Sequence, residues 1–219
     1  MDFAVPSLID LLPPSELALI QAFAIRRSYR AGEVIHERGD SVLSVGIVIS
    51  GQVRLINIAP GGLEQLVGLI YPGQNYGDAL MFGHPSRTHR ALAVGETVVD
   101  HLLAEAFQQL LIHPSIVRAF YTVASHRLVA ALEMLDDARS LPVDLRLAKL
   151  LLTLSHGSGD GRIESLQEDL AGLLGVSTVT LAKALGRLRG EGLIETGYRH
   201  LRIADLSRLQ RWLADQGAI

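Results

Sequence analysis

Residues 167–194 constrain the fold more than any other part of the chain, because they join two short helical patterns through a tight turn. The first pattern places three leucines on one face at helical spacing: Leu170, Leu173 and Leu174. Ala171 is small at the point where a second helix must cross closely. Gly175 allows the positive φ that a sharp turn after a helix needs. The stretch therefore predicts two short helices in close contact.

The second helical pattern starts at Ser177, a favourable N-cap residue, and has two different faces. Its apolar face consists of Leu181, Leu185 and Leu188. Its opposite face is polar and basic and consists of Thr178, Thr180, Lys183 and Arg187. A helix of this kind after a short first helix is typical of a unit that enters the major groove of DNA. An ordinary packed helical hairpin is the alternative, and the segment that follows argues against it.

The segment after the two helices predicts a two-stranded wing. Strands are expected over residues 194–196 and 199–203, and a last amphipathic helix over residues 206–213. The net charge of the chain is −3, which does not favour nucleic-acid binding by the chain as a whole. Residues 183–211, however, contain seven lysines and arginines against three acids. A local basic surface is expected there, although a charge spread without function would give the same count.

The first half of the chain changes to short β-rich runs. Strands are predicted over residues 33–36, 42–50, 52–59, 65–70, 91–94 and 97–103. The segments between them contain turn pairs such as Gly39-Asp40, Ser50-Gly51 and Pro72-Gly73. Many short strands with regular glycine turns indicate a small barrel or roll, not a parallel sheet.

Two short helices are predicted on either side of these strands. The first follows Pro13-Pro14, with Ser15 as its N-cap. Its buried side is expected to consist of Leu17, Ile20 and Phe23. The second covers residues 104–111.

Pro114 begins the longest helical pattern, which runs to about Ser140 and carries two apolar rows. The first row recurs at alternating spacings of four and three: Val117, Tyr121, Ala124, Leu128, Ala131, Leu135 and Ala138. The second row consists of Ile116, Phe120, Val123, Ala130 and Met134, with Arg127 as its one polar member. One row lets the helix lie on its own domain, and another at heptad spacing lets it pair with a second copy. We expect a dimer helix; a helix buried on two sides within one subunit is the alternative.

Ser140-Leu141-Pro142 is the expected hinge, because a proline breaks the helical hydrogen-bond ladder. A helix follows over residues 143–155, and Asp136-Asp137 before the hinge is interpreted as a solvated face. Residues 156–161 form a loop that is not a phosphate-binding loop, since no GK[ST] follows. No GxSxG motif and no paired carboxylates on a recognisable scaffold indicate an enzyme.

Composition excludes several classes of site. The chain has no cysteine, which rules out disulfides, cysteine-ligated zinc and iron–sulfur clusters. Eight histidines are present, but none has a ligand spacing such as HExxH, so no metal site is predicted. The first residues lack a basic segment before their apolar part, so no signal peptide is predicted. No apolar run reaches the length of a membrane span.

In this order, a glycine-punctuated roll, a long heptad helix, a hinge and a winged two-helix unit resemble the cyclic-AMP receptor protein and fumarate–nitrate regulator (CRP/FNR) family of bacterial transcription factors. The resemblance covers essentially the whole chain. It rests on YRAGEVIHERGD from Tyr29, ISGQVRL from Ile49, YPGQNYGDALMFG from Tyr71, and the two-helix unit itself.

The resemblance implies an α+β fold in three parts. These are a cyclic-nucleotide-binding-like β-roll over residues 1–112, a long dimerisation helix over 113–140, and a winged helix-turn-helix DNA-binding domain over 141–219. It also implies a cytoplasmic homodimer that binds a palindromic double-stranded DNA site, with RNA polymerase as a further partner. Two recognition helices would then enter successive major grooves about 34 Å apart.

The cyclic-nucleotide branch of the family holds the cyclic phosphate and the ribose with a Gly-Glu pair and an Arg-Ser pair. The stretch GDALMFGHPSRT offers Gly77, Asp78, Arg87 and Thr88 at the matching places. The resemblance implies that Arg87 binds the phosphate together with the Thr88 hydroxyl and the Gly77 backbone, while Asp78 accepts from a ribose hydroxyl. Asp78 is one methylene shorter than the family's glutamate, and the segment before Arg87 is one residue shorter.

The positions that supply hydroxyls to adenine in the family fall on Ala131 and Leu132, and neither can hydrogen-bond a base. Cyclic AMP, another nucleotide and an apolar effector against Ala131, Leu132 and Leu135 all stay open as ligands. Arg87 and Asp78 could instead pair with each other, which would leave the roll as a dimer scaffold in a constitutive DNA-binding protein. A haem-based gas sensor would use His84, His89 and His126, which the histidine pattern does not favour. No cofactor is assigned.

The family's base-reading arginine, glutamate and arginine fall on Thr178, Val179 and Lys183. Lys183 could contact guanine O6 and N7, and Thr178 or Val179 could lie against a thymine methyl. Phosphate contacts that position the helix are expected from Gln167, Ser177, Thr180, Arg187 and Arg199. The half-site should therefore differ from the one that the cyclic-AMP receptor protein reads.

Overall fold

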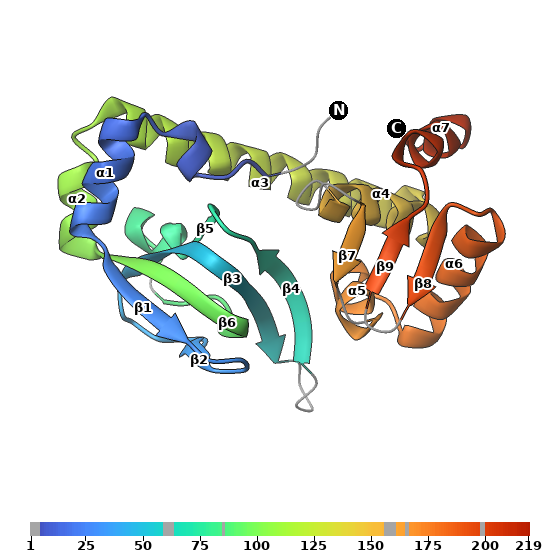
Figure 1. Cartoon of the computed structure of the whole chain (residues 1–219), viewed down its shortest axis with the longest axis horizontal. Coiled ribbons are helices and arrows are strands. Elements are labelled where there is room, and N and C mark those ends of the chain that lie inside the picture. The colour runs from blue at the N-terminus through green and yellow to red at the C-terminus, as the bar shows by residue number, and fades with distance from the viewer. Residues whose placement is uncertain (1–4, 59–63, 85, 156–160, 165–166, 198–199) are drawn as a thin grey trace. The chain divides into compact units, whose positions relative to one another are not determined.

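A computed structural model of the chain describes residues 5–58, 64–84, 86–155, 161–164, 167–197 and 200–219 (Figure 1). The chain forms two compact units, one of residues 5–127 and one of residues 128–219, which divide within the long helix α3 (Pro114–Ser140). The predicted boundaries at residues 112 and 140 lie on either side of this division.

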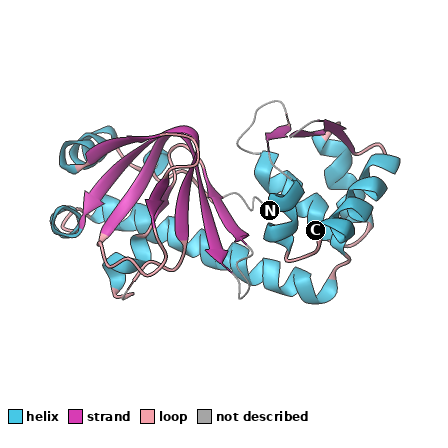
Figure 2. Cartoon of the chain, turned by 90° about the horizontal axis from the view of Figure 1, so that it is seen from below, coloured by secondary structure: helices cyan, strands magenta, loops and turns pink. Residues whose placement is uncertain are grey.

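The first unit contains an antiparallel sheet of six strands in the order β1-β6-β3-β4, with β2 paired to β6 and β5 paired to β3 (Figure 2). Its strands are β1 (Ile25–Tyr29), β2 (Val34–His36), β3 (Ser44–Ile58), β4 (Glu64–Ile70), β5 (Asn75–Tyr76) and β6 (Arg90–Leu103). Its helices are η1 (Ile9–Leu11), α1 (Pro14–Phe23), η2 (Asp78–Phe82), α2 (Ala104–Leu110) and the first half of α3. The predicted roll is thus an α+β unit.

Four predicted strands merge into two long ones, β3 and β6. The pairing of β3 with β6 shifts register twice near Gly51, whose φ is +76°. A side chain at Gly51 would lie 2.4 Å from the Glu96 carbonyl oxygen, so glycine here permits close contact between neighbouring strands. The sequence interpreted as a turn is therefore an irregularity inside a continuous strand.

Two further expectations for the first unit were wrong, and two short strands were missed. Ser15 is not the N-cap of α1; Pro13 is, and the Ser15 hydroxyl bonds the Glu16 carboxylate instead. Phe23 is exposed, whereas Ile20 is buried as expected. The short strands β1 and β5 were not predicted, because four of the five residues of β1 are exposed and β5 has only two residues.

The core of the first unit joins the sheet to α1, α2 and the first half of α3. The rings of Phe107 and Phe120 meet edge to face with their centroids 5.1 Å apart. Ile116, Phe120 and Val123 are buried, which confirms that one row of α3 lies on its own domain.

The second unit contains α4 (Val143–Ser155), β7 (Arg162–Glu164), α5 (Gln167–Leu174), α6 (Thr178–Gly190), β8 (Ile194–Gly197), β9 (His200–Ile203) and α7 (Leu206–Asp215). The three strands form a small antiparallel sheet in the order β7-β9-β8. Strand β7 was not predicted, because it has only three residues and directly follows the glycine-rich loop. The core is dominated by leucines, with Leu147, Leu151, Leu170 and Leu188 fully buried.

No single helix of the described chain is long and apolar enough to cross a membrane. The α5–α6 pair passes the test of length and composition only when both helices are taken together. That pair is bent by 102°, and Leu170, Leu174, Leu181, Leu185 and Leu188 of its two helices lie in the core of the second unit.

Candidate functional site

The turn between α5 and α6 has the geometry of a helix-turn-helix unit. The chain bends by 102° between the two helices, and Gly175 has a φ of +64° as predicted. The amide of Gly175 donates to the Gly172 carbonyl at 3.1 Å, and the amide of Val176 donates to the Ala171 carbonyl at 3.0 Å. These bonds close the end of α5 and direct the chain into α6.

Helix α6 starts and packs as its sequence predicts. The Ser177 hydroxyl caps it by accepting from the Thr180 amide at 3.2 Å. Its inner face is fully or nearly fully buried and consists of Leu181, Ala184, Leu185 and Leu188. Thr178, Val179 and Lys183 are all exposed, Val179 to 66%. The predicted base-reading residues therefore share one accessible face of a helix that is fixed by its core.

The predicted phosphate-contact residues fall into three groups. Gln167 and Ser177 are exposed at the starts of α5 and α6, and Thr180 is half-buried beside Ser177. Arg187 forms an ion pair at 2.5 Å with the buried carboxylate of Asp144, so it also attaches α6 to α4. Arg199 lies outside the described residues.

The heptad row of α3 is exposed in the single chain. Tyr121 is 74% exposed and Leu128 is 62% exposed, while Val117 and Leu135 are exposed to lesser extents. The alanines of the same row, Ala124, Ala131 and Ala138, are exposed as well. The neighbouring row of α3 is buried at Ile116, Phe120 and Val123, so the exposed apolar row is a separate surface that another chain could cover.

Arg87 is the most unusual polar residue of the first unit, because its side chain is buried, with only 5% of the residue exposed. Its Nη2 atom donates at 2.8 Å to both the carbonyl oxygen and the hydroxyl of Ser44. Its Nε and Nη1 atoms have no hydrogen-bond partner among the described residues. Burial lowers the pKa of Arg87 because desolvation disfavours the charged form.

Gly77 makes the close approach of Arg87 possible. Gly77 has a φ of +80°, and a side chain built there would lie 2.0 Å from Nη1 of Arg87. The two predicted residues therefore come together, with the unpartnered donors of Arg87 against the Gly77 backbone. Buried cationic donors of this kind suit a phosphate or a carboxylate.

Asp78 does not pair with Arg87. Its carboxylate instead forms an ion pair at 3.2 Å with Nη1 of Arg127, the polar member of the buried row of α3. Nη2 of Arg127 also donates to the Asn75 carbonyl. Burial lowers the pKa of Arg127, and the nearby Asp78 carboxylate opposes that shift. The alternative in which Arg87 and Asp78 pair with each other does not hold, because the Asp78 carboxylate pairs with Arg127.

The remaining predicted effector residues are Thr88, Ala131 and Leu132. Thr88 is exposed, and its hydroxyl bonds Nδ1 of His89 at 2.8 Å. Ala131 and Leu132 belong to the other unit, and Leu132 is 53% exposed in the single chain.

Two histidines lie inside the roll near Arg87. The His36 ring stacks on Tyr76 with centroids 5.7 Å apart, and His101 bonds the Tyr29 hydroxyl at 2.9 Å. Desolvation lowers the pKa of His36 to about 4, and the charge of Arg87 contributes to the shift. Desolvation also lowers the pKa of His101 to about 4, with Arg27 and Arg87 as additional causes. Both rings are therefore neutral at neutral pH.

Two of the histidines considered for haem, His84 and His89, are hydrogen-bonded to neighbouring residues. Nδ1 of His84 bonds the Ser86 carbonyl at 2.7 Å, and Nδ1 of His89 bonds the Thr88 hydroxyl. Within the described ranges, no group of three or more histidine, aspartate or glutamate residues is placed to hold a metal ion.

Sequence reasoning missed Ser44 and Asn75 as neighbours of the effector residues. Ser44 carries no pattern that marks it, since it simply begins a strand. Arg127 had a signal, because it is the one polar residue in an otherwise apolar row that the structure shows to be buried at Phe120 and Val123.

Both units match known domain families. Residues 26–113 match the model of the cyclic nucleotide-binding domain, and residues 145–212 match the model of the Crp-like helix-turn-helix domain. Together the two matches take in most of the roll and most of the winged unit.

The chain is also similar to transcription regulators along most of its length. It is 28% identical to the cyclic AMP receptor protein of Thermus thermophilus, over 91% of this chain and 93% of that protein. It is 26% identical to the transcriptional activator protein FnrL of Cereibacter sphaeroides, over 89% and 82% of the respective chains. The structure of FixK2 from Bradyrhizobium japonicum matches the fold with a TM-score of 0.75 at 22% identity, over 86% of this chain and 96% of that one. These relatives and the matched domains are those of regulators, not enzymes.

Proposed function

The chain belongs to the CRP/FNR family of DNA-binding transcription factors, and from that membership we propose that it works as a homodimer controlled by an anionic effector in the roll. The observation that carries the effector part is the buried Arg87 guanidinium with two unpartnered donors beside Gly77. The DNA-binding part of the proposal rests on the winged unit and not on Arg87. The protein acts in the cytoplasm, where its DNA and RNA polymerase are found.

The dimer part of the proposal is supported by the exposed heptad row of α3. A helix that leaves Tyr121 and Leu128 open to solvent gains apolar burial when the same row of a second copy covers them. A two-fold dimer would also supply the two α6 helices that a palindromic site requires.

Replacing Leu128 with glutamate tests the dimer. Two carboxylates would face each other in the seam, so the variant should sediment as a monomer at concentrations where the unchanged chain is a dimer. Val129→Glu is the matched control, since Val129 is 54% exposed but lies outside the heptad row. A dimeric Leu128→Glu variant would show that the seam lies elsewhere.

The effector part of the proposal follows from the cost of the unpartnered donors. Each buried donor without an acceptor costs about 1–3 kcal/mol, and an anion that reaches Nε and Nη1 of Arg87 removes that cost. A cyclic nucleotide is the effector class that the matched domain suggests. Ala131 and Leu132 offer no hydrogen bond to a base, so the base should be held less specifically than the phosphate.

A thermal-shift screen of cyclic AMP, cyclic GMP and inorganic phosphate tests this effector class. A ligand present at 100 times its Kd adds about 2.7 kcal/mol to the free energy of unfolding. Arg87→Met should abolish the shift, whereas Arg118→Met, which removes an exposed arginine on α3, should keep it. A flat screen with the unchanged chain would instead favour a roll that serves only as a scaffold for a constitutive regulator.

A further inference from the structure

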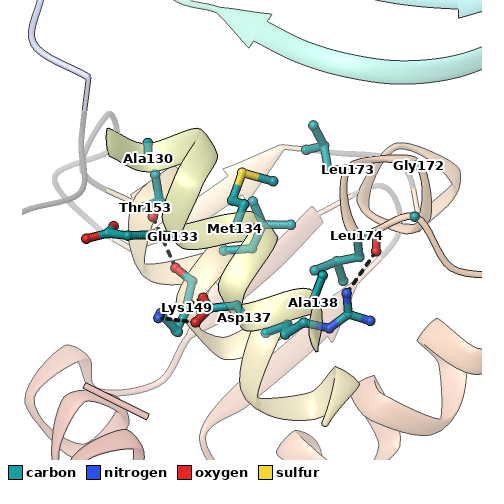
Figure 3. A pocket seen from close by; sticks show the side chains of 13 residues that line it. Ala130, Glu133, Met134, Asp137, Ala138, Lys149, Thr153, Gly172, Leu173 and Leu174 are labelled. Carbon is teal, nitrogen blue, oxygen red and sulfur yellow. Dashed lines mark hydrogen bonds and ion pairs between the residues drawn. The ribbon is translucent and has the colours of Figure 1, made fainter. Parts of the chain in front are cut away.

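A cavity of about 290 Å³ lies within the second unit, behind the turn that leads into α6. Its wall comes from the second half of α3, from α4, and from the end of α5 with Gly175. Figure 3 shows the lining side chain of Met134 between Glu133 on one side and Leu174 on the other. The volume lies just below the range of about 300–1,000 Å³ that small-molecule pockets have, so the cavity suits a small ligand.

The middle of the cavity is apolar, and most of its polar groups already have partners. The apolar lining consists of Ala130, Met134, Ala138, Leu150, Leu173 and Leu174. The Lys149 ammonium pairs with the Asp137 carboxylate at 2.7 Å. The Asp136-Asp137 pair, predicted as a solvated face, is therefore only partly so, because Asp137 belongs to the cavity wall. The Thr153 hydroxyl donates to the Lys149 carbonyl at 3.2 Å.

Arg146 is the polar group of the cavity wall that lacks a full set of acceptors. Its Nη1 atom donates to the Leu174 carbonyl at 3.3 Å, which helps to close the end of α5. Its Nε atom is buried and has no hydrogen-bond partner in the described part of the chain. A ligand acceptor in the cavity would satisfy this donor, and a carboxylate matches the fork of a guanidinium best.

We propose that this cavity binds a small amphipathic carboxylate, with its carboxylate on Arg146 and its apolar body against Met134 and Leu173. Arg146 contacts the Leu174 carbonyl, and Glu133 lies on the side of the cavity away from Leu174 (Figure 3). The opposite orientation would bring the carboxylate of the ligand towards the carboxylate of Glu133, and the two like charges disfavour it. The ligand would contact the turn that precedes α6, and it would do so independently of any effector bound in the roll.

The three methionines of the chain allow a direct test by nuclear magnetic resonance. Met134 lines the cavity, whereas Met81 packs against the core of the first unit. Octanoate, added to the full-length protein labelled with ¹³C at the methionine methyls, should shift the Met134 signal saturably and leave the Met81 signal in place. Met134→Leu and Met81→Leu variants assign the two signals.

Octan-1-ol and acetate separate the two parts of the proposed ligand. Octan-1-ol keeps the apolar body without the carboxylate and should bind at least fivefold more weakly than octanoate. Acetate keeps the carboxylate without the body and should leave Met134 unshifted at the same concentrations. Equal affinities for octanoate and octan-1-ol would overturn the role of the carboxylate without needing any variant.

A pair of arginine variants tests the residue that holds the carboxylate. Arg146→Met should weaken octanoate at least fivefold and leave octan-1-ol unchanged, because the methionine keeps an apolar stem and loses the donors. Arg139→Met is the matched control, since Arg139 is exposed on α3 and does not line the cavity. The proposal fails if Arg146→Met keeps the octanoate affinity, if Met134 shows no saturable shift, or if Met81 responds in place of Met134.

Discussion

The two units of the molecule present their functional cations in opposite ways. In the winged unit, Lys183 is exposed on a helix whose start is capped and whose inner face is buried. In the roll, Arg87 is buried and leaves two donors without partners among the described residues. An exposed cation has no desolvation cost and can meet any phosphate, whereas a buried one destabilises its surroundings until a fitting anion arrives. The difference distinguishes a surface suited to docking on DNA from the site proposed above for an anionic effector.

Of the changes predicted here, a glycine substitution in the roll should have the largest effect on the free energy of unfolding. Gly77→Ala should lower the free energy of unfolding by about 4 kcal/mol, because its Cβ would occupy the place of Arg87 Nη1 and uncouple the guanidinium from Ser44. The same variant should bind no anion in the roll. Urea denaturation followed by circular dichroism measures the loss.

Gly175→Ala is the counterpart in the winged unit. Gly175 also has a positive φ, but no atom lies within 4 Å of a Cβ built there. The expected cost is therefore the backbone cost alone, about 1 kcal/mol. Equal losses for Gly77→Ala and Gly175→Ala would mean that the roll tolerates displacement of Arg87, and the contrast between the units would disappear.

The second prediction concerns the loss of stability of the roll at low pH, and its expected effect is of intermediate size. His36 and His101 have pKa values of about 4 in the folded roll, below the ordinary value of about 6.5. Between these values the unfolded chain binds more protons, so the stability present above pH 6.5 is lost as the pH falls towards 4. Both rings are partly open to solvent, and screening reduces the loss to roughly 1–2 kcal/mol for each histidine.

Denaturation at a series of pH values checks this loss. Trp212, the one tryptophan of the chain, packs against the core of the winged unit, so its fluorescence follows that unit. Circular dichroism follows both units. His36→Gln and His101→Gln should each flatten the dependence between pH 6.5 and 4, and an unchanged slope in both variants would assign it to other groups.

The helices that carry the DNA-binding face could be predicted from the sequence because their determinants are local. Ser177 lies three residues before Thr180, whose amide it caps, and the buried leucines of α6 recur within one helix. The predicted ranges of α3 and α4 also agree with the structure. Strand β7 was missed, and β3 and β6 were each predicted as two shorter strands. Pairing across the sheet makes β3 and β6 continuous and overrides a glycine that is locally typical of a turn.

The surroundings of Arg87, the proposed effector site, were predicted only in part, because their contacts join distant segments. Ser44 contacts a residue 43 positions away, and Arg127 contacts Asp78 across 49 positions. No local pattern could pair these residues. The family resemblance brought Arg87 and Gly77 to attention, but nothing in the sequence indicated that Arg127 pairs with Asp78. The exposed threonine Thr88 shows that a matching residue type does not ensure a matching contact.

The last comparison lies within α6, between a basic residue that is free to face DNA and one that is engaged with the protein. Lys183→Ala should weaken binding to the cognate operator by about 1–3 kcal/mol and relax the preference at one base pair, since the lysine would lose a contact to a base edge. Arg187→Ala should instead reduce stability, because Asp144 would stay buried without its partner. Fluorescence anisotropy on cognate and random DNA distinguishes the two.

If Lys183→Ala weakens the binding of both DNAs equally and the salt dependence falls by about one ion, the lysine contacts a phosphate. Sequence preference would then rest on Thr178 and Val179, and the exposed face of α6 would read DNA through thymine methyls more than through hydrogen bonds.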